Sequence, residues 1–185
     1  SPEREQWTRR LHVATLALAI LALARPQWGF TWEESKQKGL DVVVAIDTSK
    51  SMLAEDIAPN RLARAKLAAL DLMSQAKSDR LGLVAFAGVA FLSCPMTFDD
   101  AAFRQSVESL DVNTLPQGGT ALAEAINTAA SAFKEGDNYK ILVLFTDGED
   151  QDSGAVEAAK QAAESGLRIF TVGIGSGEGT LLNVR

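Results

Sequence analysis

The chain has 185 residues, of which 46% are hydrophobic and 23% are charged. This length and composition suit one globular domain with an additional segment, and they exclude a disordered chain and a protein with many membrane spans. The formal net charge of −6 argues against nucleic acid as a main partner, since no basic patch is present to bind phosphates. Cys94 and His12 are the only residues of their types, which excludes an internal disulfide, a zinc site of thiolates or imidazoles, and a histidine-based triad.

An apolar run covers residues 11–24, directly after a pair of arginines. It is shorter than the roughly 20 apolar residues that a membrane-spanning helix usually needs. Three interpretations therefore compete, namely a membrane helix, a secretory signal and a buried helix. Trp7 before the run and Trp28 after it favour the membrane helix, because tryptophan gathers at membrane interfaces. We predict a transmembrane helix within residues 1–27, followed by a polar connector over residues 28–40.

From residue 41 onward, short apolar runs alternate with longer amphipathic segments. Apolar runs without a polar alternation, such as 41–46 and 140–146, predict strands that are buried on both faces of a parallel sheet. Gly88-Val89 predicts a tight turn into an antiparallel edge strand. The alternation as a whole predicts an α/β fold with a doubly wound, mainly parallel open sheet covered by helices on both faces. We expect strands at 41–46, 80–87, 90–93, 140–146 and 168–174, and helices at 61–76, at 120–134, at 154–165 and from Asp99-Asp100 onward.

Polar side chains gather where the predicted strands end and the predicted helices begin. Asp47, Ser49 and Ser51 follow the first strand, Thr120 begins a helix, and Asp147 follows the strand 140–146. In open α/β sheets, ligands bind beyond the carboxyl ends of the strands. The five side chains are two carboxylates and three hydroxyls, a set of oxygen donors that suits Mg²⁺, with Mn²⁺ or Ca²⁺ as alternatives. We therefore predict that these five residues bind a divalent metal ion.

The chain around these residues is consistent with such a site. An extended loop after the first strand would point residues 47, 49 and 51 to the same side. Gly118-Gly119 and Gly148 would allow the backbone to approach closely. Two carboxylates only just balance the charge of a divalent ion, and the hydroxyls add no charge. If water separates one carboxylate from the metal, the ion lacks an anionic ligand, and an acidic side chain of another protein would complete its shell. The alternative for each single hydroxyl is that it merely caps a helix or a turn.

The motif Asp47-x-Ser49-x-Ser51, together with Thr120 and Asp147, resembles the metal-ion-dependent adhesion site (MIDAS) of von Willebrand factor A (VWA) domains. The resemblance covers residues 39–174. It implies the strand order 3-2-1-4-5-6, in which the first and fourth strands are central neighbours. It also implies that Ser49 and Ser51 bind the metal directly, that Thr120 binds it directly or through water, and that Asp47 and Asp147 act largely through water.

Two further segments resemble bacterial Bat-type aerotolerance proteins, which are membrane-anchored VWA proteins. These segments are Ala24-Arg25-Pro26-Gln27-Trp28-Gly29 and Pro59-Asn60-Arg61-Leu62. The resemblance implies the bacterial inner membrane as the location, and other Bat-type proteins and a MoxR-type AAA+ ATPase as partners. Members of that group continue beyond Gly175 with a further strand, a helix and a second membrane span. We therefore expect residues 41–185 to be a VWA domain that is truncated at its C-terminal end.

Three functions are compatible with these observations. The first is a membrane-anchored, non-enzymatic module that uses its metal ion to bind an aspartate or glutamate of a partner protein. The second is a phosphatase of the haloacid dehalogenase type, but its mechanism needs a second carboxylate two residues after Asp47, where this chain has Ser49. The third is a structural subunit of a membrane assembly with a vestigial site. We expect the first.

Overall fold

The computed structural model describes residues 2–23, 39–115, 119–133, 136, 138–148 and 154–176. The chain divides into two compact units, residues 1–36 and 37–185. Residues 28–38 of the predicted connector, Gly118 and residues 177–185 lie outside the described part. The domain boundaries given above remain a prediction.

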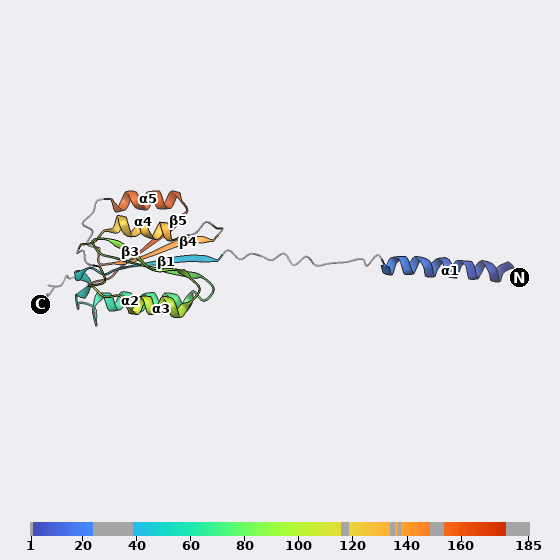
Figure 1. The fold of residues 1–185 in the computed structure, drawn as a ribbon, viewed down its shortest axis with the longest axis horizontal. Coiled ribbons are helices and arrows are strands. Elements are labelled where there is room, and N and C mark those ends of the chain that lie inside the picture. The colour runs from blue at the N-terminus through green and yellow to red at the C-terminus, as the bar shows by residue number, and fades with distance from the viewer. Residues whose placement is uncertain are drawn as a thin grey trace. The chain divides into compact units, whose positions relative to one another are not determined.

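Helix α1, Pro2–Leu23, is the described element of the first unit (Figure 1). Its first turns carry charged residues such as Arg9 and Arg10, so its apolar part begins only at Leu11. None of the described helices is both long enough and apolar enough to cross a membrane. For this part of the chain the prediction of a helix is therefore confirmed, while residues 24–27 of the predicted transmembrane segment lie outside the described residues.

The second unit contains a sheet of five described strands in the order β3-β2-β1-β4-β5. All neighbouring strands are parallel except β2 and β3, so β3 is an antiparallel edge strand, as predicted. The order agrees with the first five positions of the order 3-2-1-4-5-6, and the sixth strand would fall outside the described residues. The strands are β1 Leu40–Asp47, β2 Arg80–Phe86, β3 Ala90–Thr97, β4 Tyr139–Thr146 and β5 Leu167–Gly173.

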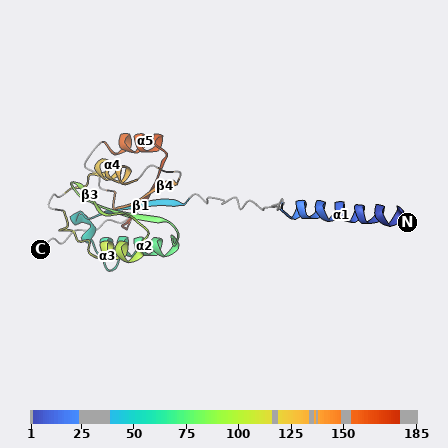
Figure 2. The same ribbon diagram turned by 45° about the vertical axis from the view of Figure 1, so that its right-hand side comes forward.

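Helices cover both faces of the sheet, which confirms the doubly wound fold. Figure 1 shows α2 and α3 below the sheet and α4 and α5 above it, and the turned view in Figure 2 shows the same two layers. The described helices of this unit are α2 Arg61–Gln75, α3 Asp100–Glu108, α4 Leu122–Ala132 and α5 Ala155–Glu164, with a short 3-10 helix at Lys50–Leu53.

Strand β1 is the middle strand of the sheet and contributes to two separate cores. Val42, Val44 and Ile46 pack toward α2 and α3, whereas Val43 and Ala45 pack toward α4 and α5. Since successive side chains of a strand point to opposite faces, a central strand between two helix layers must be apolar at every position. This requirement explains the unbroken apolar run of the sequence. The run ends at Asp47, the last residue of the strand.

Most described boundaries agree with the prediction to within one residue, and two larger differences have a structural reason. Strand β3 continues to Thr97, beyond the predicted residue 93, because an edge strand tolerates Pro95, which lacks an N–H group. Helix α4 begins at Leu122, two residues after the predicted start. The backbone N–H of Ala121 donates to the carbonyl oxygen of Ala87 at 2.6 Å, and this bond holds the preceding loop against the end of β2.

An ion pair fixes the amino-terminal edge of the sheet. Asp41, with an exposed fraction of 1%, accepts hydrogen bonds from Arg80 on β2, at 2.8 Å to Nε, and from Asn138 before β4, at 2.9 Å. Burial alone would raise the pKa of Asp41, but the hydrogen bonds from Arg80 and Asn138 and the nearby charges of Arg80 and Lys140 outweigh it and lower the pKa. The three central strands are therefore held in register at the edge opposite to the candidate site.

Candidate metal centre

The site is built around Asp47, the last residue of β1. Its exposed fraction is 0%, and both of its carboxylate oxygens accept hydrogen bonds. The backbone N–H of Ser49 donates to Oδ1 at 2.8 Å, and the hydroxyl of Thr146 donates to Oδ2 at 3.0 Å. The carboxylate is therefore fixed in orientation by the loop that follows β1 and by the end of the neighbouring strand β4.

Ser49 and Ser51 lie next to each other, with 2.9 Å between their Oγ atoms. Both residues are buried. The prediction of an extended loop is wrong beyond Ser49, because residues Lys50–Leu53 form a 3-10 helix. The backbone N–H of Met52 donates to the carbonyl oxygen of Ser49 at 3.0 Å. This tight turn, rather than the alternation of a strand, brings the two hydroxyls together.

Thr120 is connected to the same edge of the sheet through the backbone of its neighbour. It is buried, with an exposed fraction of 5%. Its neighbour Ala121 donates to Ala87, and the residue before Ala87, Phe86, accepts hydrogen bonds from the N–H and the hydroxyl of Thr48. A chain of short contacts thus links the loop after β1, the end of β2 and the loop before α4. Gly119 has a φ of 108°, a conformation that glycine adopts without strain.

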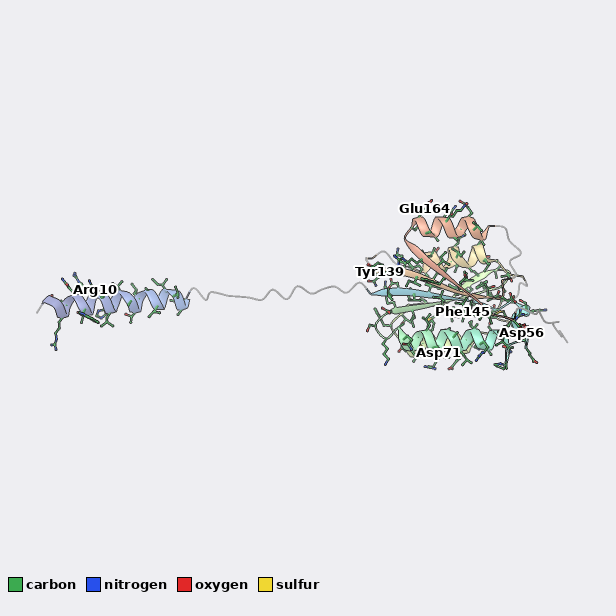
Figure 3. All side chains as sticks on the ribbon, turned by 180° about the vertical axis from the view of Figure 1, so that it is seen from behind. Arg10, Asp56, Asp71, Tyr139, Phe145 and Glu164 are labelled. Atoms are coloured by element: carbon green, nitrogen blue, oxygen red, sulfur yellow. The ribbon has the colours of Figure 1, made fainter. Side chains whose placement is uncertain are left out.

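Asp147 follows β4 and pairs with an arginine that the prediction did not include. Arg61 Nη1 lies 3.0 Å from Asp147 Oδ2. The same guanidinium binds Asp56 through Nε at 2.9 Å and through Nη2 at 3.0 Å. Figure 3 labels Asp56 at this end of the sheet, and it labels Tyr139, the first residue of β4, at the opposite end. The site therefore contains a fixed positive charge beside one of its two predicted acidic ligands.

The buried position of the Asp47 carboxylate favours a cation next to it. Burial raises the pKa of Asp47, and the negative charge of Asp147 adds to this effect, although the hydrogen bonds from Ser49 and Thr146 partly oppose it. A buried carboxylate is costly unless a positive charge compensates it. A divalent ion next to Asp47 would remove this cost.

The donor set fits a hard divalent ion. In the described part of the chain, no group of three or more His, Cys, Asp or Glu side chains lies together. The oxygens at this site come instead from two carboxylates and three hydroxyls, which suits Mg²⁺ or Mn²⁺. All five predicted residues lie at the carboxyl edge of the central strands or directly beside it. Metal binding by these residues remains a prediction.

Three further residues of the site were missing from the prediction. Thr146 orients Asp47, Arg61 binds Asp147, and Asp56 holds Arg61. The sequence contains one signal that could have identified Arg61. A cation in the first turn of a helix opposes the helix dipole, so an arginine at this position indicates a nearby acidic partner. For Asp56 and Thr146 the sequence contains no comparable signal, because their partners are set by the fold.

Comparisons with known proteins place this geometry in a family. Residues 42–149 match the family model described as "von Willebrand factor type A domain". Among solved structures, the "conserved hypothetical protein BatB from Bacteroides thetaiotaomicron" is 39% identical, with a TM-score of 0.74 over 76% of this chain and 69% of that chain. An "aerotolerance-related membrane protein from Bacteroides fragilis" is 36% identical, with a TM-score of 0.76 over 79% of this chain and 73% of that chain.

A curated relative, named "UPF0353 protein", comes from Mycolicibacterium paratuberculosis. It is 32% identical over 97% of this chain and 58% of its own length. The chain thus spans a little more than half of this relative.

More distant structures share the fold alone. Proximal thread matrix protein 1 from the mussel byssus is 19% identical with a TM-score of 0.63 over 75% of this chain and 39% of its own, and its structure is named for a zinc-occupied MIDAS motif. The manganese-loaded TRAP protein of Plasmodium vivax is 17% identical with a TM-score of 0.63 over 76% of this chain and 59% of its own.

Proposed function

Since the chain belongs to the von Willebrand factor type A domain family, we propose that it binds a divalent metal ion at the carboxyl edge of its sheet. The bound ion then binds an acidic side chain of a partner protein. The proposed ligands are the five residues predicted from the sequence, Asp47, Ser49, Ser51, Thr120 and Asp147. Two structures of this fold are named for a zinc-occupied and a manganese-loaded form, which supports a metal-binding role.

The distance between the two serine hydroxyls carries the proposal. Adjacent ligands of an octahedral ion with bonds of about 2.0–2.1 Å lie about 2.9 Å apart. The Oγ atoms of Ser49 and Ser51 are 2.9 Å apart. For Ca²⁺, with bonds of about 2.3–2.6 Å, the corresponding separation is about 3.3–3.7 Å. The two hydroxyls are hydrogen-bonded to each other at this distance, and the same separation would suit adjacent ligands of Mg²⁺ or Mn²⁺.

The carboxylates take a different part from the serines. Both oxygens of Asp47 already accept hydrogen bonds, which suits a role through metal-bound water rather than direct ligation. The charge of Asp147 is shared with Arg61. A divalent ion with two neutral hydroxyl ligands and two such carboxylates remains short of negative charge, so a carboxylate from a partner completes its shell.

The cellular role is part of the same proposal. The similarity to a BatB protein and to an aerotolerance-related membrane protein supports a Bat-type role at the bacterial inner membrane. Expected partners are other Bat-type proteins and a MoxR-type AAA+ ATPase. Because the chain covers 58% of a curated relative, these partners concern the whole protein.

We also propose that the domain acts by binding rather than catalysis. A phosphatase of the haloacid dehalogenase type needs a general acid two residues after its first aspartate, and Ser49 has no group that titrates in the required range. Release of phosphate from a generic phosphomonoester at a rate above that of the Asp47→Ala variant would contradict this proposal.

A calorimetric titration of the full chain with MgCl₂ and MnCl₂ tests metal binding. We expect one site, and a melting temperature that rises with metal concentration and returns to its initial value with EDTA. The control is Asp71→Ala, which removes an exposed carboxylate on α2. Absence of both the heat and the shift in melting temperature would exclude the metal site, and it would favour a structural subunit with a vestigial site.

A pull-down from a bacterial lysate, with the full chain as bait, tests whether partner binding depends on the metal ion. We expect partners that elute with EDTA and that Asp47→Ala fails to capture, whereas Asp71→Ala captures them. Equal capture with and without EDTA would contradict adhesion through the metal.

A further inference from the structure

Arg61 connects three segments of the chain beside the proposed metal. It lies at the first position of α2, and its side chain is 11% exposed. Its guanidinium binds Asp56 through two nitrogens and Asp147 through the third. Asp56 in turn accepts a hydrogen bond from the backbone N–H of Ser176 at 2.7 Å. The arginine is thus held by the loop before α2, by the end of β4 and by the segment after β5.

The packing around the guanidinium is close. A Cβ atom added to Gly175 would lie 3.4 Å from Cζ, Nε and Nη2 of Arg61. Two nitrogens are committed to Asp56 in a bidentate pair, a geometry that fixes the plane of the guanidinium. Arg61 therefore presents Nη1 to Asp147 from a fixed position.

The location of this charge has a local cost. A cation in the first turn of a helix opposes the helix dipole, and α2 has no acidic residue there to compensate it. Pairing with Asp56 alone would satisfy the guanidinium charge. The contact to Asp147 is additional, and it involves a carboxylate of the proposed metal site.

We propose that Arg61 is a positioning residue that holds the Asp147 carboxylate and competes with the divalent ion for it. This inference rests on the proposed metal site. In the absence of metal, the arginine supplies the positive charge that Asp147 needs at this nearly buried position. When the ion binds, Arg61 keeps part of the Asp147 charge and adds its own repulsion, which weakens metal binding and leaves the ion more attractive to an external carboxylate.

The two possible roles of Arg61 predict opposite changes in metal affinity when the arginine is removed. A purely structural arginine would support the geometry of the site, so its loss would weaken metal binding and stability together. A competing arginine lowers metal affinity, so its loss strengthens metal binding while it destabilises the metal-free protein. Only the second role predicts that metal affinity rises while the stability of the metal-free protein falls.

The test compares the full-length wild type with Arg61→Gln and with a matched control, Arg64→Gln. Arg64 lies on the same helix and is exposed. Both variants change the formal net charge from −6 to −7, so any difference between them reflects the position of the charge. Affinity for Mn²⁺ is measured by calorimetry, and the melting temperature is measured in EDTA.

We expect Arg61→Gln to bind Mn²⁺ about tenfold more tightly than the wild type and to melt at a lower temperature in EDTA. The control should stay within about twofold in affinity, because an exposed charge is screened by solvent and salt. If Arg61→Gln does not fold, Arg61→Lys replaces it. Lysine cannot bind both carboxylates with a bidentate fork, so we expect a smaller gain in Mn²⁺ affinity and a smaller loss in melting temperature.

The outcomes separate this inference from the proposed function. If the wild type binds Mn²⁺ and Arg61→Gln binds it equally or more weakly, the inference is wrong and the metal site stands. If only Arg61→Gln binds Mn²⁺, the competition is supported and the proposed function of the wild type is wrong. If neither chain binds Mn²⁺, both are wrong.

Discussion

At the scale of single residues, Asp47 shows a conflict between stability and binding. Its carboxylate is buried beside a second carboxylate, Asp147, and burial together with that charge raises its pKa. A buried charge of this kind is retained where a ligand compensates it, and it costs stability when the ligand is absent.

Replacement of Asp47 by Asn tests this conflict. Asparagine keeps the shape and removes the charge, so we expect the melting temperature in EDTA to rise by about 2–4 °C. The same variant should show no stabilisation by Mg²⁺, because the negative charge and one of the two acceptor oxygens are lost. Melting curves with EDTA and with MgCl₂ measure both effects, and a lower melting temperature in EDTA would show that the charge of Asp47 stabilises the metal-free fold.

Asp41, at the opposite edge of the sheet, has the reverse behaviour. Burial raises the pKa of Asp41, but the hydrogen bonds from Arg80 and Asn138 and the nearby positive charges outweigh it, so the pKa lies below that of a free aspartate. A carboxyl group with a lowered pKa in the folded state contributes stability above the unfolded pKa, and this contribution is lost as the pH falls through the folded pKa.

Replacement of Asp41 by Asn should therefore reduce the free energy of unfolding at pH 7 by about 1–3 kcal/mol, since it leaves Arg80 without its charged partner. The difference from the wild type should shrink as the pH falls below about 3.8. Urea unfolding between pH 2.5 and pH 7 measures it, with Asp71→Asn, an exposed change on α2, as the control. A difference that is constant with pH would contradict the role of the ionised carboxylate.

At the scale of elements, helix α2 connects the core with the site. Its amino-terminal end is capped by Asn60, whose side-chain oxygen accepts a hydrogen bond from the N–H of Ala63 at 2.8 Å. The cap directly precedes Arg61, so the first turn of the helix positions both the helix and the arginine that binds Asp147.

Replacement of Asn60 by Ala should cost about 1 kcal/mol of stability, because one N–H of the first turn loses its acceptor. It should also change the affinity for Mn²⁺, since Arg61 becomes less well fixed. Gln105→Ala, at an exposed position of α3, is the control and should change neither quantity. A loss of stability with an unchanged affinity for Mn²⁺ would show that the cap does not affect the site.

The elements were predictable because their signals are local. The unbroken apolar run of β1, the cap at Asn60 and the antiparallel turn before β3 are each determined by a few neighbouring residues. The start of α4 was misplaced, because the contact between Ala121 and Ala87 joins residues that are distant in the sequence. For the transmembrane helix, the described part of α1 contains no stretch that is long and apolar enough to cross a membrane.

The candidate site could be proposed from its residue types, but its geometry could not. Five oxygen donors in the order of a known motif select Asp47, Ser49, Ser51, Thr120 and Asp147 as candidates, and metal binding by them remains a prediction. The pairing of Arg61 with Asp147 joins residues 86 positions apart, and no pattern along the chain encodes it. The turn at Lys50–Leu53 was missed because a single 3-10 turn has no hydrophobic period to reveal it.

At the scale of the whole molecule, the two edges of the sheet differ in what holds them. The amino edge is fixed by the internal ion pair between Asp41 and Arg80. Among the described residues, the carboxyl edge carries Asp47 and Asp147, and Arg61 pairs with Asp147 while it also binds Asp56. A metal ion should therefore change the dynamics of one edge only.

Hydrogen–deuterium exchange of the full chain with MgCl₂ and with EDTA tests this asymmetry. We expect slower exchange with Mg²⁺ in the segments 48–54, 119–121 and 147–148, because the ion links loops that otherwise open independently. The start of β2 and the start of β4, at the amino edge, should exchange at the same rate in both conditions. The Asp47→Asn variant should show no difference between the conditions at either edge. Protection spread evenly over both edges would indicate that the metal stabilises the fold as a whole, and the carboxyl edge would then not be the place where it binds.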